Sequence, residues 1–280
     1  MRRVRFTKMH GIGNDYVYVD AVTHRIDEPA ALARRVSPRH TGIGSDGLIL
    51  ICPSSVADCR MEMYNADGSR GQMCGNGIRC VAKYAYEHGL AARNPMRVET
   101  DCGIKELQLH IDNGRVDQVT VDMGAPILDG PRIPVAAEGR VINAPLDVGG
   151  QRYHITCVSM GNPHCVVFVD AVTSLPLVTI GPQFEHHPFF PQRVNTEFIH
   201  VLGPHEVRMR VWERGSGETQ ACGTGACAAV VAGVLNRKHE RSATVHLLGG
   251  DLGVEWRAAD DHVMMTGPAT EVFSGELEAE

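Results

Sequence analysis

The sequence lacks the features that mark membrane, secreted and nucleic-acid-binding proteins. Its 280 residues contain no run of about 18 apolar residues, which a membrane-spanning helix requires. The basic start at Met1–Phe6 is followed by no apolar stretch, so no secretory signal is expected. The net charge is −6, and no basic run is dense enough to follow a phosphate backbone. These absences favour a cytoplasmic protein that binds neither membrane nor nucleic acid.

Cysteine and lysine are present in patterns that exclude further classes. The nine cysteines form no C-x-x-C pair, so neither a structural zinc site nor a disulfide framework is expected. Lysine occurs four times and never in a glycine-rich phosphate element, which argues against pyridoxal phosphate. We therefore expect neither a metal nor a cofactor. Four cysteines in apolar or strand-like segments are predicted to fill the core: Cys52, Cys59, Cys102 and Cys157.

Two short cysteine–glycine elements dominate what is present. Cys74-Gly75-Asn76-Gly77 and Cys222-Gly223-Thr224-Gly225 are separated by 222 − 74 = 148 residues. The same offset links Asn14 to Asn162 (162 − 14 = 148) and Asn65 to Glu213 (213 − 65 = 148). Three separate elements on one diagonal indicate that the chain contains two copies of one unit.

Most of the remaining chain is typical of short strands, with alternating or β-branched residues. The predicted strands are Val17–Asp20, Leu48–Ile51, Arg60–Tyr64, Met96–Thr100, Val116–Met123, Cys165–Val169, Val207–Trp212, Thr244–Leu248 and Val263–Thr266. Helices are predicted at Ala30–Val36, Gly77–His88 and Gly225–Leu235.

The helix at Gly225–Leu235 is apolar on every side, so it must be buried all round. In a strand-rich unit, such a helix belongs at the centre with the sheet around it. We therefore predict an α+β fold of two pseudo-symmetric domains, each a curved, mostly antiparallel sheet or barrel wrapped around a central helix. The predicted domains are residues 1–124, joined by residues 268–280, and residues 125–267. Met123–Pro134 is the expected connection.

A cysteine before a glycine pair that opens a helix has a defined chemical use. The first turn leaves backbone N–H groups unpaired, and its dipole favours negative charge, so a carboxylate can bind there. The same field is expected to lower the pKa of the cysteine. Two such elements would let one thiolate remove an α-proton while the opposite thiol supplies another.

Seven stretches, two of which contain the cysteine–glycine elements, show that the chain resembles the diaminopimelate epimerase family over nearly its whole length. They are His10–Asp15, Thr41–Asp46, Asn65–Ser69, Met73–Cys80, Met160–His164, Arg193–Phe198 and Glu213–Gly225, with Thr266–Ala269 similar to the C-terminal element. The resemblance implies a cofactor-independent isomerase. That enzyme converts LL-2,6-diaminoheptanedioate to the meso form in the biosynthesis of lysine and peptidoglycan precursors. It also implies a homodimer.

The resemblance also implies the site residues. Cys74 and Cys222 match the two acid/base thiols, while His164 and Glu213 match the residues that assist the first and second thiol. Substrate contacts are implied for Asn14, Asn65, Gly75, Asn76, Asn162, Asn195, Glu213, Arg214, Gly223 and Thr224. One position departs from the pattern, because Gly47 stands where many members carry a glutamine that contacts the substrate.

Two alternatives remain open from the sequence. Proline racemases and hydroxyproline epimerases also use facing thiols, but typically have histidine at the position of Asn76, and they lack a Glu213-Arg214 pair. A thiol-based redox or anion-binding protein is the alternative from another class. Cys74 and Cys222 could form a disulfide if they face each other, although redox dithiols usually lie close in sequence.

Overall fold

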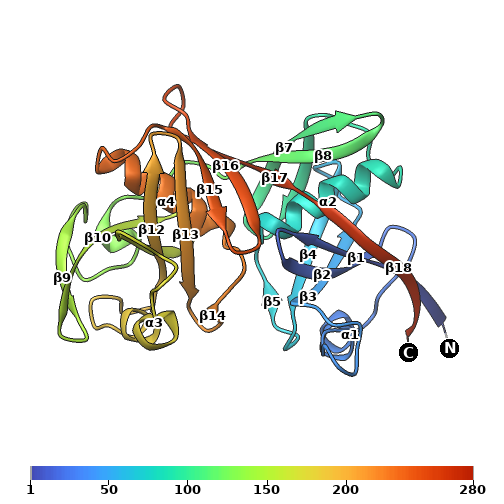
Figure 1. The fold of residues 1–280 in the computed structure, drawn as a ribbon. Coiled ribbons are helices and arrows are strands. Elements are labelled where there is room, and N and C mark those ends of the chain that lie inside the picture. Colours follow the sequence, from blue (N-terminus) through green and yellow to red (C-terminus); the bar gives the residue numbers. More distant parts are fainter. Residues whose placement is uncertain (1, 280) are drawn as a thin grey trace. The chain divides into compact units, whose positions relative to one another are not determined.

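The computed structural model describes residues 2–279 and divides them into two compact units (Figure 1). Unit 1 comprises the chain up to Asp122 together with the segment from Thr266 onward, and unit 2 comprises Met123–Met265. The chain therefore leaves unit 1, forms the whole of unit 2, and returns along β17 (Val263–Pro268) to complete unit 1. Among the described residues, no helix has the length and apolar character needed to cross a membrane.

The sheet of unit 1 is mostly antiparallel. Its strands pair in the order β18–β1–β2–β3–β4–β6–β7–β8, with parallel pairs at β2/β3 and β4/β6, and β5 pairs with β4. The strands are β1 (Arg2–Gly11), β2 (Asn14–Asp20), β3 (Gly47–Cys52), β4 (Cys59–Asn65), β5 (Arg70–Gly71), β6 (Met96–Thr100), β7 (Gly103–Asp112), β8 (Arg115–Asp122) and β18 (Thr270–Ala279).

The sheet of unit 2 repeats this arrangement. Its strands pair in the order β9–β10–β11–β12–β13–β15–β16, with parallel pairs at β11/β12 and β13/β15, and β14 pairs with β13. The strands are β9 (Ala144–Val148), β10 (Gln151–Ser159), β11 (Pro163–Phe168), β12 (Asn195–Gly203), β13 (Glu206–Glu213), β14 (Gly217–Glu218), β15 (Ser242–Leu247) and β16 (Gly250–Trp256).

One helix lies at the centre of each unit, as the sequence predicted. These helices are α2 (Gly75–Glu87) and α4 (Gly223–Leu235), which are again offset by 148 residues (223 − 75 = 148). α2 packs against strands of unit 1 and α4 against strands of unit 2. Residues Ala226–Gly233 of α4 are all buried, so a polar face there would have no access to water. The predicted fold class is confirmed.

A second helix covers the outer face of each sheet. α1 (Pro29–Val36) packs on Val17, Leu48 and other residues of unit 1 through Leu32, and α3 (Leu177–Glu185) packs in unit 2 through Phe184. The sequence pattern does not predict α3, which contains a glycine and an internal proline at Gly181 and Pro182.

One expectation about the cysteines differs from the structure. Cys59 and Cys157 are buried, but Cys52 is half-buried and Cys102 is exposed in the turn between β6 and β7, so Cys102 does not fill the core. The expected connection Met123–Pro134 contains the short 3₁₀ helix η1 (Gly130–Arg132) and packs against unit 2.

Candidate active site

In unit 1, Cys74 occupies the N-cap position of the central helix α2. Its extended backbone turns the side chain back over the first turn, where Sγ accepts a hydrogen bond from the Gly77 amide at 3.3 Å. The thiol donates to Oδ1 of Asn14 at 3.1 Å. A thiol at an N-cap lies in the positive end of the helix dipole, where a thiolate is stabilised.

Asn14 is held in place by the carboxylate of Asp46, which was not predicted as a site residue. Its Nδ2 donates to Oδ2 of Asp46 at 2.7 Å, which leaves Oδ1 directed at Cys74. Burial and the neighbouring charge of Asp15 raise the pKa of Asp46, while Arg39 bonds its other oxygen at 2.8 Å. A chain of contacts from Arg39 through Asp46 and Asn14 thus fixes the acceptor of the thiol proton.

Two other predicted residues of unit 1 are engaged through their side chains. Asn76 is buried, and its Oδ1 accepts from the fully buried Arg79 at 3.0 Å. Arg79 also donates to the carbonyl of Gly75 at 3.2 Å, so it holds the first turn of α2. Asn65 donates to Ser69 at 2.9 Å in the turn that follows β4.

In unit 2, Cys222 occupies the same position on α4, but its environment differs. The side chain is buried, and Sγ lies 3.5 Å from Oγ1 of Thr224. Burial raises the pKa of Cys222 well above its ordinary value, and the charges of Glu213 and Glu197 raise it further. The expected lowering is therefore wrong for Cys222, because desolvation and two carboxylates outweigh the helix terminus.

Glu213, at the end of β13, is the carboxylate adjacent to this thiol. Burial raises its pKa, whereas hydrogen bonds with Thr219 and Cys222 and the neighbouring His164 oppose the shift. Oε1 of Glu213 accepts from Thr219 at 2.5 Å. A carboxyl group with a raised pKa, bonded to a thiol, is suited to exchanging a proton with that thiol.

His164 lies on β11 and is fully buried between two partners. Nδ1 lies 2.7 Å from Oε1 of Glu197 on β12, and Nε2 lies 3.0 Å from Oδ1 of Asn162. Unit 2 thus places Glu197, Glu213 and Thr224 close to Cys222, and Glu197 was not predicted as a site residue. Its signal in the sequence is that it is the single acidic residue of β12.

Arg214 lies in the loop after β13, which is supported by Asn195 at the start of β12. The Arg214 amide donates to Oδ1 of Asn195 at 2.9 Å, and the guanidinium donates to the Gln192 carbonyl at 3.2 Å. The buried carboxylate of Glu185 accepts from the Gly215 amide at 2.9 Å and from Nε1 of Trp212 at 2.7 Å. Asn195 therefore holds the loop that carries Arg214.

Gly47 has a structural explanation in the close pairing of β3 with β4. A Cβ added to Gly47 would lie 2.1 Å from the carbonyl oxygen of Tyr64 and 3.1 Å from the ring of Tyr16. The backbone carbonyl cannot move aside as a flexible side chain could. The glycine is therefore required by this strand pairing, and a glutamine does not fit the present backbone.

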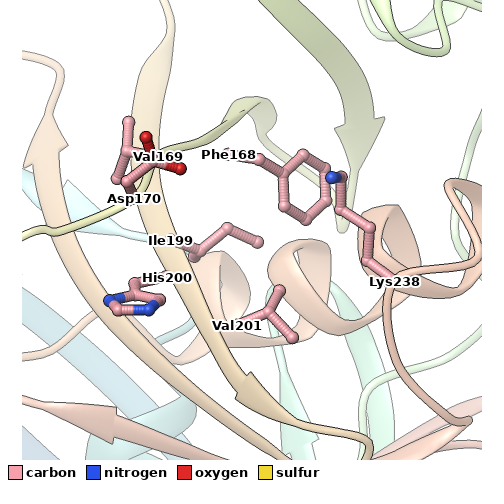
Figure 2. A pocket seen from close by; sticks show the side chains of 7 residues that line it. All are labelled: Phe168, Val169, Asp170, Ile199, His200, Val201 and Lys238. Atoms are coloured by element: carbon pink, nitrogen blue, oxygen red, sulfur yellow. The ribbon is translucent and has the colours of Figure 1, made fainter.

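One pocket of unit 2 lies apart from these residues. It has a volume of about 380 Å³ and is lined by residues that include Phe168, Asp170, His200 and Lys238 (Figure 2). Lys238 places its ammonium 4.9 Å from the centre of the Phe168 ring. None of the predicted site residues lines this pocket. Within residues 2–279, no group of three or more His, Cys, Asp or Glu residues is placed to hold a metal.

Comparison with known proteins decides between the two epimerase families left open above. The family model for diaminopimelate epimerase matches residues 6–128 and 156–272. The chain belongs to the diaminopimelate epimerase family. It is 56% identical to the diaminopimelate epimerase of Agathobacter rectalis, over 98% of this chain and 99% of that one. The diaminopimelate epimerase of Acetivibrio thermocellus is 54% identical over 98% and 99% of the two chains.

Solved structures extend the fold beyond the diaminopimelate epimerase family. A phenazine biosynthesis protein of the PhzF family from Bacillus anthracis matches with a TM-score of 0.70 at 16% identity, over 99% of this chain and 100% of that one. A hydroxyproline epimerase from Agrobacterium vitis matches with a TM-score of 0.68 at 16% identity, over 99% and 91%. At these identities the likeness concerns the fold alone.

Proposed function

We propose that this protein epimerises diaminopimelate by two-base proton exchange, with Cys74 and Cys222 as the acid/base thiols. It converts the LL form to the meso form for lysine and peptidoglycan synthesis. The observation that carries the mechanism is the placement of one cysteine at the N-cap of each central helix. The identity with named diaminopimelate epimerases supports the substrate.

In the proposed reaction, the α-carboxylate of the substrate binds backbone amides at the helix N-termini that carry the thiols. The relevant amides are those of Gly75, Asn76, Gly223 and Thr224, which begin α2 and α4. As the α-carbon loses its proton, negative charge moves onto the carboxylate. Backbone N–H groups aimed at that carboxylate stabilise the charge as it forms. No cofactor is needed to accept it.

The proton balance requires one thiolate and one thiol. The thiolate forms an S–H bond with the α-proton, and the electron pair of the broken C–H bond stays on the substrate. The opposite thiol then gives its proton to the other face of the carbon, which inverts the centre. The enzyme is left with thiol and thiolate interchanged, the form that catalyses the reverse reaction, and a proton must return between the sulfurs by exchange with solvent before the next LL molecule reacts.

The remaining groups have supporting roles in this proposal. Glu213 and His164 exchange protons with the thiols or stabilise their charged forms. Arg214 grips the distal carboxylate, since a guanidinium can bind a carboxylate through two hydrogen bonds. Asn14, Asn65, Asn162 and Asn195 bind polar groups of the substrate or fix the groups that do.

The test is turnover of LL-diaminopimelate in deuterated water, with proline and hydroxyproline assayed in parallel. Deuterium should appear at the α-carbon of the product. Cys74→Ala and Cys222→Ala should each lower kcat about 10²-fold or more, whereas Cys102→Ala, which removes an exposed cysteine, should not. Turnover without deuterium, or a fully active variant at Cys74 or Cys222, contradicts the mechanism.

We also propose that the protein acts as a homodimer in the cytoplasm, as the family resemblance implies. Light scattering should then give twice the chain mass of 30.5 kDa. A mass of one chain at assay concentration contradicts the dimer but leaves the reaction mechanism untouched.

A further inference from the structure

Glu197 is a fully buried carboxylate whose two oxygens differ in their hydrogen bonding. Oε1 lies 2.7 Å from Nδ1 of His164, and both side chains have no exposed surface. Within residues 2–279, Oε2 has no hydrogen-bond partner. A buried carboxylate with one unsatisfied oxygen costs free energy, so its presence in the strand calls for a reason.

The N-terminus of α4 reduces this cost. A Cβ added to Gly225, in the first turn of α4, would lie 2.7 Å from Oε1 of Glu197. The same carboxylate oxygen therefore lies against the first turn of α4 and against His164. The helix dipole favours negative charge at this end. Gly225 is what allows the carboxylate to approach so closely.

The fold of unit 2 does not itself require a carboxylate at this position. The offset of 148 aligns Glu197 with Ile49 (197 − 49 = 148) and His164 with Tyr16 (164 − 16 = 148). The strand registers agree, since Ile49 pairs with Met63 as Glu197 pairs with Val211 (211 − 63 = 148).

The contact with the central helix is also repeated. A Cβ added to Gly77 of α2 would lie 2.7 Å from Cδ1 of Ile49, the same separation that Glu197 has in unit 2. An apolar side chain therefore fills the equivalent space in unit 1. The carboxylate of Glu197 is therefore specific to unit 2 and is not required by the backbone arrangement that both units share.

We propose that Glu197 is a positioning residue that fixes the ring and the tautomer of His164. A carboxylate only accepts hydrogen bonds, so Nδ1 of His164 carries a hydrogen. Nε2 is then the nitrogen that gains or loses a proton, and Oδ1 of Asn162, 3.0 Å away, accepts its hydrogen when the ring is charged. This inference rests on the proposed function, in which His164 assists a thiol. Glu197 itself does not touch the substrate.

The kinetic test compares four proteins with diaminopimelate as substrate: wild type, Glu197→Gln, His164→Gln and the double variant. Glu197→Gln should lower kcat about 10- to 100-fold with KM within about twofold, as for other partners that orient a functional histidine. The double variant should be no slower than His164→Gln, because Glu197 acts through that ring. Ile49→Val, at the matching position of unit 1, is the control and should keep nearly full activity.

A spectroscopic readout keeps the test independent of turnover and of variant folding. Nitrogen NMR of the wild-type protein with labelled histidine should show a hydrogen on Nδ1 of His164. Glu197→Ile, which installs the side chain found at the equivalent position of unit 1, should abolish that tautomer preference. A wild-type His164 with its hydrogen on Nε2 alone overturns the proposal without any variant.

The remaining outcomes separate this inference from the proposed function. If His164→Gln is slow but Glu197→Gln is as fast as wild type, Glu197 has no positioning role and the thiol mechanism stands. Additive losses would mean that Glu197 acts directly on Cys222, which also overturns the positioning role. A fully active His164→Gln refutes the role of the histidine in the proposed function and this inference with it.

Discussion

Glu185 provides a sharp test of how the loop carrying Arg214 is held. Its buried carboxylate accepts hydrogen bonds from Trp212, Gly215 and Arg193 at 2.7, 2.9 and 3.2 Å. In Glu185→Gln, an NH₂ group replaces one of the two accepting oxygens and then faces an N–H donor, with which it forms no hydrogen bond. Leaving one buried donor unpaired costs about 1–3 kcal/mol. For a chain of this size, that lowers Tm by about 2–10 °C.

The effect of Glu185→Gln should depend on pH in a defined direction. Burial tends to raise the pKa of Glu185, but the hydrogen bonds from Trp212 and Gly215 outweigh it, and the net pKa is lowered. A carboxyl group whose pKa is lower in the folded state stabilises the protein at pH values above its pKa in the unfolded state. That stabilisation is lost as the pH falls through its pKa in the folded state. The difference in free energy of unfolding between wild type and variant should therefore be full at pH 7 and shrink below about pH 4.

The assay is denaturant unfolding at several pH values, followed by KM measurement at neutral pH. We expect KM to rise, because the loop with Arg214 loses its anchor, while kcat falls less. Asp147→Asn is the control, since its ion pair with Arg152 at 2.8 Å is exposed and such pairs contribute about 0–1 kcal/mol. Equal unfolding of wild type and Glu185→Gln at pH 7, with an unchanged KM, refutes the reasoning.

Two further variants test the proposed binding of the distal carboxylate by Arg214 and the structural need for glycine at position 47. Arg214→Ala should raise KM for diaminopimelate at least about tenfold, because the distal carboxylate loses a bidentate partner. Tm should stay nearly unchanged, because the guanidinium donates to a single backbone carbonyl. Unaltered substrate binding in calorimetry excludes the distal-carboxylate role. Gly47→Gln should lower the free energy of unfolding by about 1–3 kcal/mol rather than restore a substrate contact. The reason is that its Cβ would lie 2.1 Å from the Tyr64 carbonyl oxygen. A variant with wild-type Tm and a lower KM would contradict this prediction.

The sequence was sufficient to predict the two central helices and nine of the eighteen strands found in residues 2–279. The apolar composition of Gly225–Leu235 left no face for water, and the repeated C-G-x-G element located the start of each helix. α3 was missed for a physical reason. A Cβ on Gly181 would lie 2.2 Å from the Trp212 ring, so the glycine that weakens the helical signal is demanded by tertiary packing.

The residues that support the site were harder to predict. Asp46 and Glu197 lie in motifs that carried the resemblance, but their partners come from other strands, and no local pattern reveals the pairing. The pKa of Cys222 was expected to fall because the helix terminus was considered alone. Burial and the two nearby carboxylates reverse the direction, and both depend on the folded chain.

The matching strand registers have a consequence for how the site could change over evolution. Tyr16 and His164, Ile49 and Glu197, and Asn65 and Glu213 occupy the same places in the two repeats. Each pair differs in polarity or charge while the surrounding backbone is kept. After a duplication, single substitutions at these positions can therefore give the two repeats different chemical roles without a change of backbone structure. Chimeras that swap these pairs between repeats would measure which exchanges created the specialised half.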